Sequence, residues 1–278
     1  MALPSSGAIS LANIQTEFGG SNPISLSEYY RGGAYVTANN TGVPTSGAIQ
    51  LDDFYGAVKQ FSFTISSNYS TPQNLRSLAI AAGWNGVDYL VVTNNAIISS
   101  NTASSAALTI NGSYPNGVLF TNNSTIVGMG GKGGDYGQAG GAGGNAILVS
   151  SAVTINNAGT IAGGGGGGGS SPIFGWSGTD LTTGGGGGAS GLTQSLGGTG
   201  AYGAVGNPSS LSGSFYSVPG SGYAAGAGGV SNSPSGNGGT WGTAGQTAGY
   251  AGGAAGAAVS GNSYVTWLAT GTRYGALV

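Results

Sequence analysis

Few side chains in this sequence could do chemistry, and their types limit what that chemistry could be. The chain has no His and no Cys, so the usual general base, the thiol nucleophile and the commonest metal ligands are missing. The only adjacent acidic pair, Asp52 and Asp53, lies in a repeated motif where we expect a helix to begin, a position that Asp favours. We therefore expect a protein that is not an enzyme and that uses neither a metal ion nor a cofactor.

A glycine-rich segment has part of the pattern of a phosphate-binding loop. It reads Gly-Met-Gly-Gly-Lys-Gly at 128–133, but such a loop needs Ser or Thr directly after the Lys, where this chain has Gly133. We interpret Lys132 and Asp135 as solvated side chains of glycine-rich triplets.

Charge and composition exclude further classes of protein. Of the 278 residues 12 are charged, with a net charge of −2 and no basic cluster, so we expect no nucleic-acid partner. Disordered chains combine low hydrophobicity with high charge, whereas 39% of these residues are hydrophobic, so we expect an ordered fold. No apolar run reaches the roughly 18 residues of a membrane span, and the first residues lack the pattern of a signal peptide. We expect a protein made in a cytoplasm without membrane insertion.

A motif occurs three times in the first segment. Each copy reads Ile, a small or polar residue, Leu, any residue, an acidic or amide residue and a large apolar residue, at 9–14, 24–29 and 49–54. Ser, Asp and Asn accept hydrogen bonds from the free amides of a helix start, so each copy is predicted to enter one helical turn. Small segments usually need a partner to complete a core. We interpret residues 1–60 as a docking module, with a merely structural cap as the alternative.

The middle segment, 61–127, has the patterns of strands and one helix. Residues 61–65 alternate as a strand does, and 74–83 carry apolar residues at helical spacing before a Gly. Further strands are expected at 89–93, 96–99, 107–110 and 118–121, and a terminal strand at 264–268. The segment is predicted to be a small α+β or β-rich domain.

Glycine dominates the last segment. Twelve glycines precede residue 128 and 49 follow from there to residue 278, many of them in triplets, which sets a boundary near Val127. Polyproline II geometry has about three residues per turn and no internal hydrogen bonds, so each amide and carbonyl needs a neighbouring chain. Glycine allows such helices to approach closely because it has no Cβ. Residues 128–278 are therefore predicted to form a polyglycine II helix bundle.

The loops between the glycine tracts carry aromatic residues. Function concentrates in loops held by a rigid scaffold, and exposed aromatic side chains often dominate binding energies. The candidate binding residues are Phe174, Trp176, Phe215, Tyr216, Tyr223 and Trp241. Aromatic side chains also bury large areas, so a core or lid role for each stays open.

Both ends of the chain resemble proteins of tailed bacteriophages. The start, MALPSSGAISLANIQTEFGGSNPISLSEYYRGGAYV, is similar to the N-terminus of many virion and tail-fibre proteins; GMGGKGGDYGQAGG and the ending NSYVTWLATGTRYGALV resemble glycine-rich tail adhesins. The resemblance implies an N-terminal part that attaches to the virion and a polyglycine II domain that presents loops to a receptor. It assigns virion attachment to Ile9, Leu11, Ile24, Leu26, Ile49 and Leu51.

The predicted fold class is mostly irregular and β, with an N-terminal docking module, a small α+β or β-rich domain and a C-terminal polyglycine II bundle. The predicted function is a phage tail-fibre or tail-tip adhesin, located in the virion, that binds a bacterial surface receptor. Expected partners are other virion tail or fibre proteins and a host surface protein or glycan, and a homotrimer stays open. The alternative is a structural virion component, such as a head fibre or baseplate spike, without a receptor role. An ice-binding or matrix protein is disfavoured, because a secreted binder has no use for a docking module.

Overall fold

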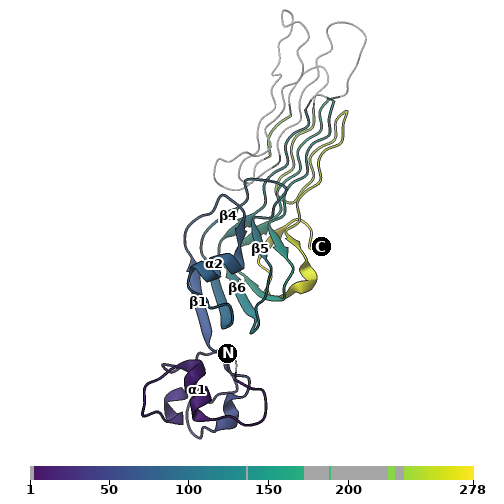
Figure 1. Cartoon of the computed structure of the whole chain (residues 1–278). Coiled ribbons are helices and arrows are strands. Elements are labelled where there is room, and N and C mark those ends of the chain that lie inside the picture. Colours follow the sequence, from purple (N-terminus) through teal and green to yellow (C-terminus); the bar gives the residue numbers. More distant parts are fainter. Residues whose placement is uncertain (1–2, 136, 172–187, 189–224, 229–234) are drawn as a thin grey trace, which may run out of the picture. The chain divides into compact units, whose positions relative to one another are not determined.

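The structure is a computed structural model of the chain (Figure 1) that describes residues 3–135, 137–171, 188, 225–228 and 235–278. It contains two compact units whose segments interleave along the sequence. The first unit comprises Met1–Phe63, Ala79–Val92 and Ser113–Leu119, and the second comprises Thr64–Leu78, Thr93–Gly112 and Phe120–Val278. The domain boundaries at residues 60 and 127 stay predictions.

Each copy of the N-terminal motif forms one short helix, as predicted. The helices are α1 (Leu11–Phe18) and the 3₁₀ helices η1 (Leu26–Tyr29) and η2 (Leu51–Phe54). In every copy the acidic or amide residue of the motif accepts a hydrogen bond from the amide just before the helix, which holds an otherwise unpaired donor. These pairs are Ser10 with Asn13 (3.0 Å), Ser25 with Glu28 (3.1 Å) and Gln50 with Asp53 (2.7 Å). The helix-start role expected for Asp53 is confirmed.

Thirteen strands lie within the described residues, and they form three sheets. The sheet orders are β1-β3-β6-β9-β12, β13-β10-β7-β4 and β11-β8-β5-β2. The expected strands and helix of the middle segment are present, as is the terminal strand. The bounds are β1 Gln60–Ile65, β2 Gln73–Asn74, α2 Leu75–Ala81, β3 Tyr89–Asn94, β4 Ile98–Ser99, β5 Leu108–Ile110, β6 Val118–Asn122, β7 Thr125–Val127, β8 Ile147–Val149, β9 Val153–Asn157, β10 Thr160–Ala162, β11 Val259–Ser260, η4 Asn262–Tyr264, β12 Val265–Ala269 and β13 Thr272–Tyr274.

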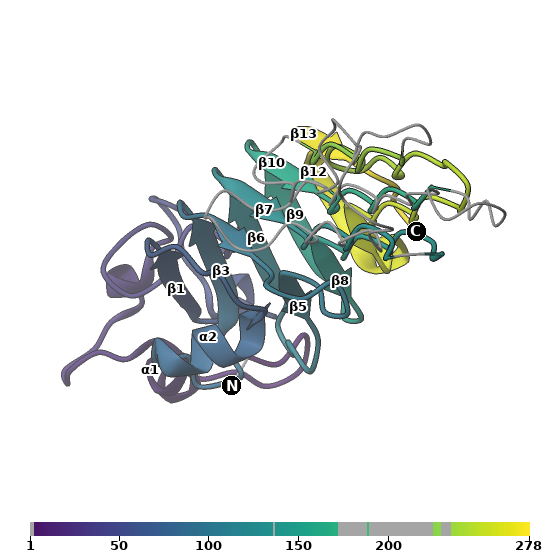
Figure 2. The same ribbon diagram turned by 90° about the horizontal axis from the view of Figure 1, so that it is seen from above.

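The chain visits the three sheets in a repeating order. Strands β6, β7 and β8 lie in the three different sheets, and so do β9, β10 and β11. Both four-stranded sheets pair in parallel throughout, as do β9 and β12; Figure 2 shows β7 beside β10. Because each turn of the chain stacks on the previous one, this is a three-sided parallel β-coil.

A row of buried asparagines aligns the turns of this coil. The Asn94 Nδ2 donates to Asn122 Oδ1 and the Asn122 Nδ2 donates to Asn157 Oδ1, each at 2.8 Å. All three side chains are buried, so these bonds satisfy amides that would be costly to leave unpaired. Isoleucines such as Ile126 and Ile161 fill the coil interior with no exposed surface.

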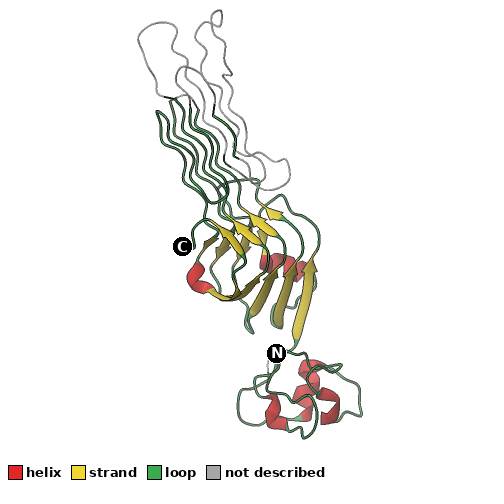
Figure 3. Cartoon of the chain, turned by 180° about the vertical axis from the view of Figure 1, so that it is seen from behind, coloured by secondary structure: helices red, strands yellow, loops and turns green. Residues whose placement is uncertain are grey.

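The glycine-rich segments leave the coil at one corner. Residues 128–146 connect β7 to β8, and residues 163–258 connect β10 to β11, so both insertions join the same two sheets. In Figure 3 the described parts run as extended loops beyond the strands, and Figure 1 shows them side by side. We call these described segments the glycine array.

The central segment of the array, 163–170, bonds to several neighbours in turn. Its amides at 163, 166 and 169 donate to the carbonyls of Tyr274, Thr243 and Gln246, while those at 164, 167 and 170 donate to Gly144, Gly141 and Gln138. The carbonyls at 162, 165 and 168 accept from Gly128, Gly131 and Gly134. The hydrogen-bonding groups of residues three apart therefore point to the same side of the segment. A Cβ at any glycine from 163 to 169 would overlap a backbone carbonyl oxygen of another segment.

Candidate functional site

The three helices of the N-terminal segment share one apolar core. The last residue of each motif copy, Ile14, Tyr29 or Phe54, has no exposed surface. The Tyr29 and Phe54 rings meet edge to face with centroids 6.4 Å apart, an arrangement that aromatic pairs prefer. The repetition of a large apolar residue at this motif position thus builds the core.

The six predicted attachment residues lie around this core. All are partly buried and pack against it: Ile9, Leu11, Ile24, Leu26, Ile49 and Leu51. Each side chain therefore covers the core and still exposes part of its apolar surface. We call these six residues the Ile-Leu set.

The three motif copies are joined in a closed cycle. In each copy the residue that follows the motif reaches the loop before the next copy, and the third copy reaches back to the first. The Gln15 Nε2 donates to the Gly20 carbonyl (3.1 Å) and to Asn22 Oδ1 (3.2 Å), the Tyr30 hydroxyl donates to the Gly47 carbonyl, and the Tyr55 hydroxyl donates to the Gly7 carbonyl (2.5 Å). These bonds thus link the three copies in a ring within one chain.

The sequence reading missed Gln15, Tyr30 and Tyr55. A signal was present, because Tyr30 and Tyr55 each follow the last residue of a motif copy, and Gly7 and Gly47 stand two residues before the Ile of theirs. The cyclic order itself has no trace in the sequence, since it depends on which loop lies beside which helix.

The apolar core of the N-terminal segment shifts the pKa of Tyr29. Burial, and to a smaller extent the charge of Glu28 and the neighbouring Tyr35, raise the pKa of its hydroxyl above the ordinary value of 10.0. The hydroxyl donates to the Gly19 carbonyl at 2.7 Å, a bond that needs the protonated form. The neutral side chain is therefore the form that this core accommodates.

The predicted receptor-binding residues fall mainly outside the described part of the chain. Phe174, Trp176, Phe215, Tyr216 and Tyr223 are all outside the described residues.

Trp241, the sixth predicted receptor-binding residue, belongs to a buried cluster. It is 9% exposed and packs with Val127 and Ala162, and its ring lies 6.0 Å from that of Tyr274. This position corresponds to the core role that the sequence left open, so Trp241 does not enter the receptor-binding proposal below.

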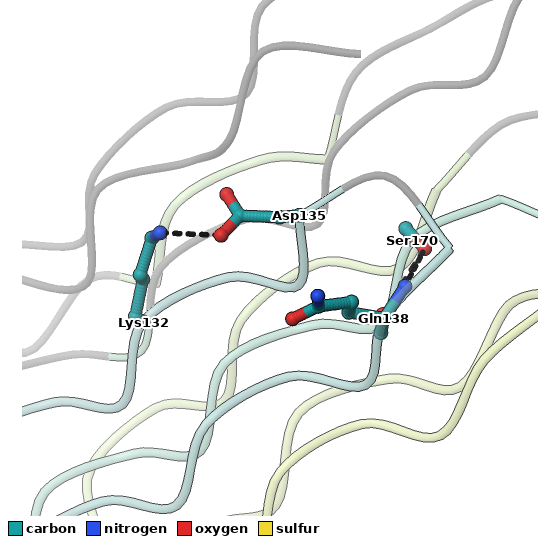
Figure 4. A network of polar contacts seen from close by, with 4 residues as sticks. All are labelled: Lys132, Asp135, Gln138 and Ser170. Atoms are coloured by element: carbon teal, nitrogen blue, oxygen red, sulfur yellow. Dashed lines mark hydrogen bonds and ion pairs between the residues drawn. The ribbon is translucent and has the colours of Figure 1, made fainter. Parts of the chain in front are cut away.

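Polar side chains close one turn of the glycine array (Figure 4). Lys132 and Asp135 form an ion pair of 2.6 Å with side chains 53% and 46% exposed, in agreement with their interpretation as solvated residues. The buried Ser170 hydroxyl donates to the Gln138 carbonyl (3.0 Å) and accepts from the Gln138 amide (3.1 Å). These contacts supply partners for backbone groups at the turn.

The described residues contain no group of His, Cys, Asp and Glu that could hold a metal ion. A membrane-spanning helix is likewise not found among them.

Comparison with known proteins identifies the family of this chain. A family model described as phage tail fibre adhesin Gp38 matches residues 60–278. The fold is similar to the crystal structure of the gp37-gp38 adhesin tip complex of the bacteriophage S16 long tail fiber, with 26% identity, a TM-score of 0.64, and coverage of 99% of this chain and 100% of that chain. No curated protein matched the sequence.

Together, the fold and these matches define a host-binding adhesin of a phage tail. The chain belongs to the Gp38 family of phage tail fibre adhesins. Its place is accordingly the virion tail.

Proposed function

We propose that residues 1–60 attach this adhesin to another tail fibre protein, and that a polyglycine II domain presents aromatic loops to the host. The main support for attachment is the closed cycle of three motif copies. Each copy has an Ile and a Leu of the Ile-Leu set at its surface. Neither function requires catalysis, so we assign no enzymatic role.

The Ile-Leu set supports attachment through its incomplete burial. Complete burial of one such side chain is worth about 1.5–3 kcal/mol, and part of that remains to be gained in each of the six. Three linked copies of one motif suit a partner that offers three sites. The similar S16 structure is a gp37-gp38 complex, which supports a tail fibre protein as the partner. This arrangement does not require a homotrimer of the adhesin itself.

The attachment surface is tested by changing one Leu in each copy to a polar residue of similar size. The triple variant Leu11→Asn, Leu26→Asn, Leu51→Asn should bind phage particles that lack the adhesin about tenfold more weakly or worse, because hot-spot apolar residues dominate such interfaces. The measurement is the amount of adhesin that sediments with the particles.

A matched control changes the exposed residue after each Leu, as Ala12→Asn, Ser27→Asn, Asp52→Asn, and should bind normally. The melting temperature of both triple variants reports whether the module remains folded, and the single variant Leu26→Asn serves if the triple variant does not. Normal binding by a folded Leu variant would overturn the attachment proposal.

The polyglycine II proposal is supported by the bonding in the central segment of the array. The backbone groups of successive residues hydrogen-bond to different neighbouring segments, and those of residues three apart bond on the same side. Polyproline II geometry has this period of three residues per turn. Each backbone bond contributes about 1 kcal/mol net, and together they offset the entropy lost when glycines are ordered.

The receptor-binding proposal concerns Phe174, Trp176, Phe215, Tyr216 and Tyr223, with a host surface protein or glycan as the partner. The support is the membership in an adhesin family and the position of these residues in the long insertion between β10 and β11. Loops on rigid scaffolds are where binding residues concentrate.

A further inference from the structure

Four Asn-Gly pairs occur in the sequence, and they differ in their surroundings. They are Asn85-Gly86, Asn111-Gly112, Asn116-Gly117 and Asn237-Gly238. Because glycine has no Cβ, its backbone nitrogen can approach the side-chain amide of the preceding Asn. From the differences among the four pairs we propose that Asn111 is a site of spontaneous deamidation, at which the tail adhesin acquires a new carboxylate.

Hydrogen bonds restrain the reacting nitrogen in two of the pairs. The Gly117 amide donates to the Tyr114 carbonyl at 2.9 Å, and the Gly238 amide donates to the Gly226 carbonyl at 3.0 Å. A bonded amide must first give up its partner before it can attack. Within the described part of the chain, the amide of Gly112 makes no hydrogen bond.

The third alternative, Asn85, is restrained through its side chain. Its Oδ1 accepts from the Val87 and Asp88 amides, each at 2.9 Å, and its Nδ2 donates to Asp88 Oδ1 at 2.8 Å. These bonds hold the side-chain amide in a turn. Asn111 is exposed, and its Oδ1 accepts a hydrogen bond from the Asn74 Nδ2 at 2.7 Å.

A cation lies beside the reacting peptide of Asn111. A Cβ built on Gly112 would lie 2.8 Å from Arg76 Cδ and 3.5 Å from Arg76 Nε, so the Arg side chain runs directly along this glycine. Positive charge nearby favours the deprotonated form of an acid. It should therefore favour loss of the Gly112 amide proton, the event that creates the nucleophile.

The reaction requires only water. The Gly112 nitrogen, after losing its proton to solvent base, forms a bond to Cγ of Asn111, while the bond from Cγ to the side-chain nitrogen breaks. That nitrogen takes up a proton and leaves as ammonia, and a cyclic imide remains. Water then opens the imide at either carbonyl, which yields Asp or isoaspartate at position 111.

The product should disturb the corner that follows β5. Isoaspartate adds one methylene to the backbone between Asn111 and Gly112, while the Gly112 carbonyl accepts a bond from the Ser151 hydroxyl at 2.6 Å in the next turn of the coil. The longer backbone cannot keep both this bond and the pairing of β5 with β8 unchanged. Aged protein should therefore melt at a lower temperature than fresh protein.

Mass spectrometry of the full-length protein tests the proposal. After incubation in mildly alkaline buffer, a double digest that cuts after aromatic residues and after proline places Asn85, Asn111, Asn116 and Asn237 in separate fragments. The cut after Pro115 is needed because the bond between Tyr114 and Pro115 resists cleavage. The mass increase of one deamidation should appear in the Asn111 fragment severalfold faster than in the other three. Equal rates in all four fragments, or a faster rate in another one, would overturn the assignment.

Two variants sharpen the test. Asn111→Gln should remove the early mass increase and keep the melting temperature of stored protein constant, because a Gln side chain would form a larger, slower ring. Arg76→Gln should slow deamidation of Asn111 severalfold without changing the other three fragments. An unchanged rate in this second variant would contradict the role given to the cation.

Discussion

At the scale of single residues, Tyr29 couples the stability of the N-terminal segment to pH. Its side chain is fully buried, and its hydroxyl donates to the Gly19 carbonyl. Since its folded-state pKa lies above the unfolded value of 10.0, the protonated form stabilises the fold. That contribution is fully present below pH 10.0 and is lost as the pH rises through the folded-state pKa.

We therefore expect the variant Tyr29→Phe to weaken the dependence of the melting temperature on pH in the alkaline range. In the parent protein the melting temperature should fall from about pH 10 upward, and the variant should fall less. Thermal melts followed by circular dichroism across this range measure the difference. Tyr264→Phe, at a residue 50% exposed, should behave as the parent; a fall of equal size in the Tyr29 variant would exclude Tyr29 as the source.

At the scale of elements, the glycine array depends on backbones that approach without side chains between them. Gly166 donates to the Thr243 carbonyl (3.0 Å) and accepts from the Gly239 amide (2.7 Å). A Cβ there would overlap the Gly253 carbonyl. Because that carbonyl belongs to backbone and not to the end of a flexible side chain, the added atom can be accommodated only by separating the segments.

The variant Gly166→Val should consequently be destabilised by about 3 kcal/mol or more, at or above the upper end of ordinary overpacking. Chemical denaturation followed by circular dichroism measures the free energy of unfolding. The control is Ala254→Val, which adds the same branched side chain at an exposed position of the array and should change stability little. If both variants have the same free energy of unfolding, close backbone approach at Gly166 does not determine the stability of the array.

At the scale of the whole molecule, our proposal places attachment and receptor contact in one chain. With 12 charged residues among 278, recognition of the host should rest on apolar and aromatic contact, which salt screens little. The double variant Trp176→Ala, Tyr216→Ala should reduce adsorption of phage to the host about tenfold or more, because aromatic residues dominate binding hot spots. Adsorption rates of particles carrying each form, at low and high salt, measure this.

The matched control for the double variant is Tyr264→Ala, which removes an exposed aromatic side chain from η4. It should adsorb normally. Sedimentation of the adhesin with the particles confirms that attachment is intact in each variant. Normal adsorption by particles that carry the double variant would remove Trp176 and Tyr216 from the receptor site.

Local features of this protein were determined by its sequence alone. The helix starts at Ser10, Ser25 and Gln50 follow from polar groups within three residues of each other, and β1 and α2 follow from apolar periodicity. These signals are readable because the interacting groups are close neighbours in the chain. The match to a tail adhesin family bears out the function inferred from the resemblance.

Only the tertiary structure decided how these pieces come together. Contacts between residues far apart in the sequence include the parallel pairing of β10 with β7 and β13, the bonds of Tyr30 and Tyr55 that close the cycle, and the burial of Trp241. A parallel pair needs a long connection. The residue pattern of a strand does not depend on which distant strand it pairs with. Trp241 likewise looks the same in a loop or a core, and its neighbours Val127 and Ala162 are brought to it by the coil.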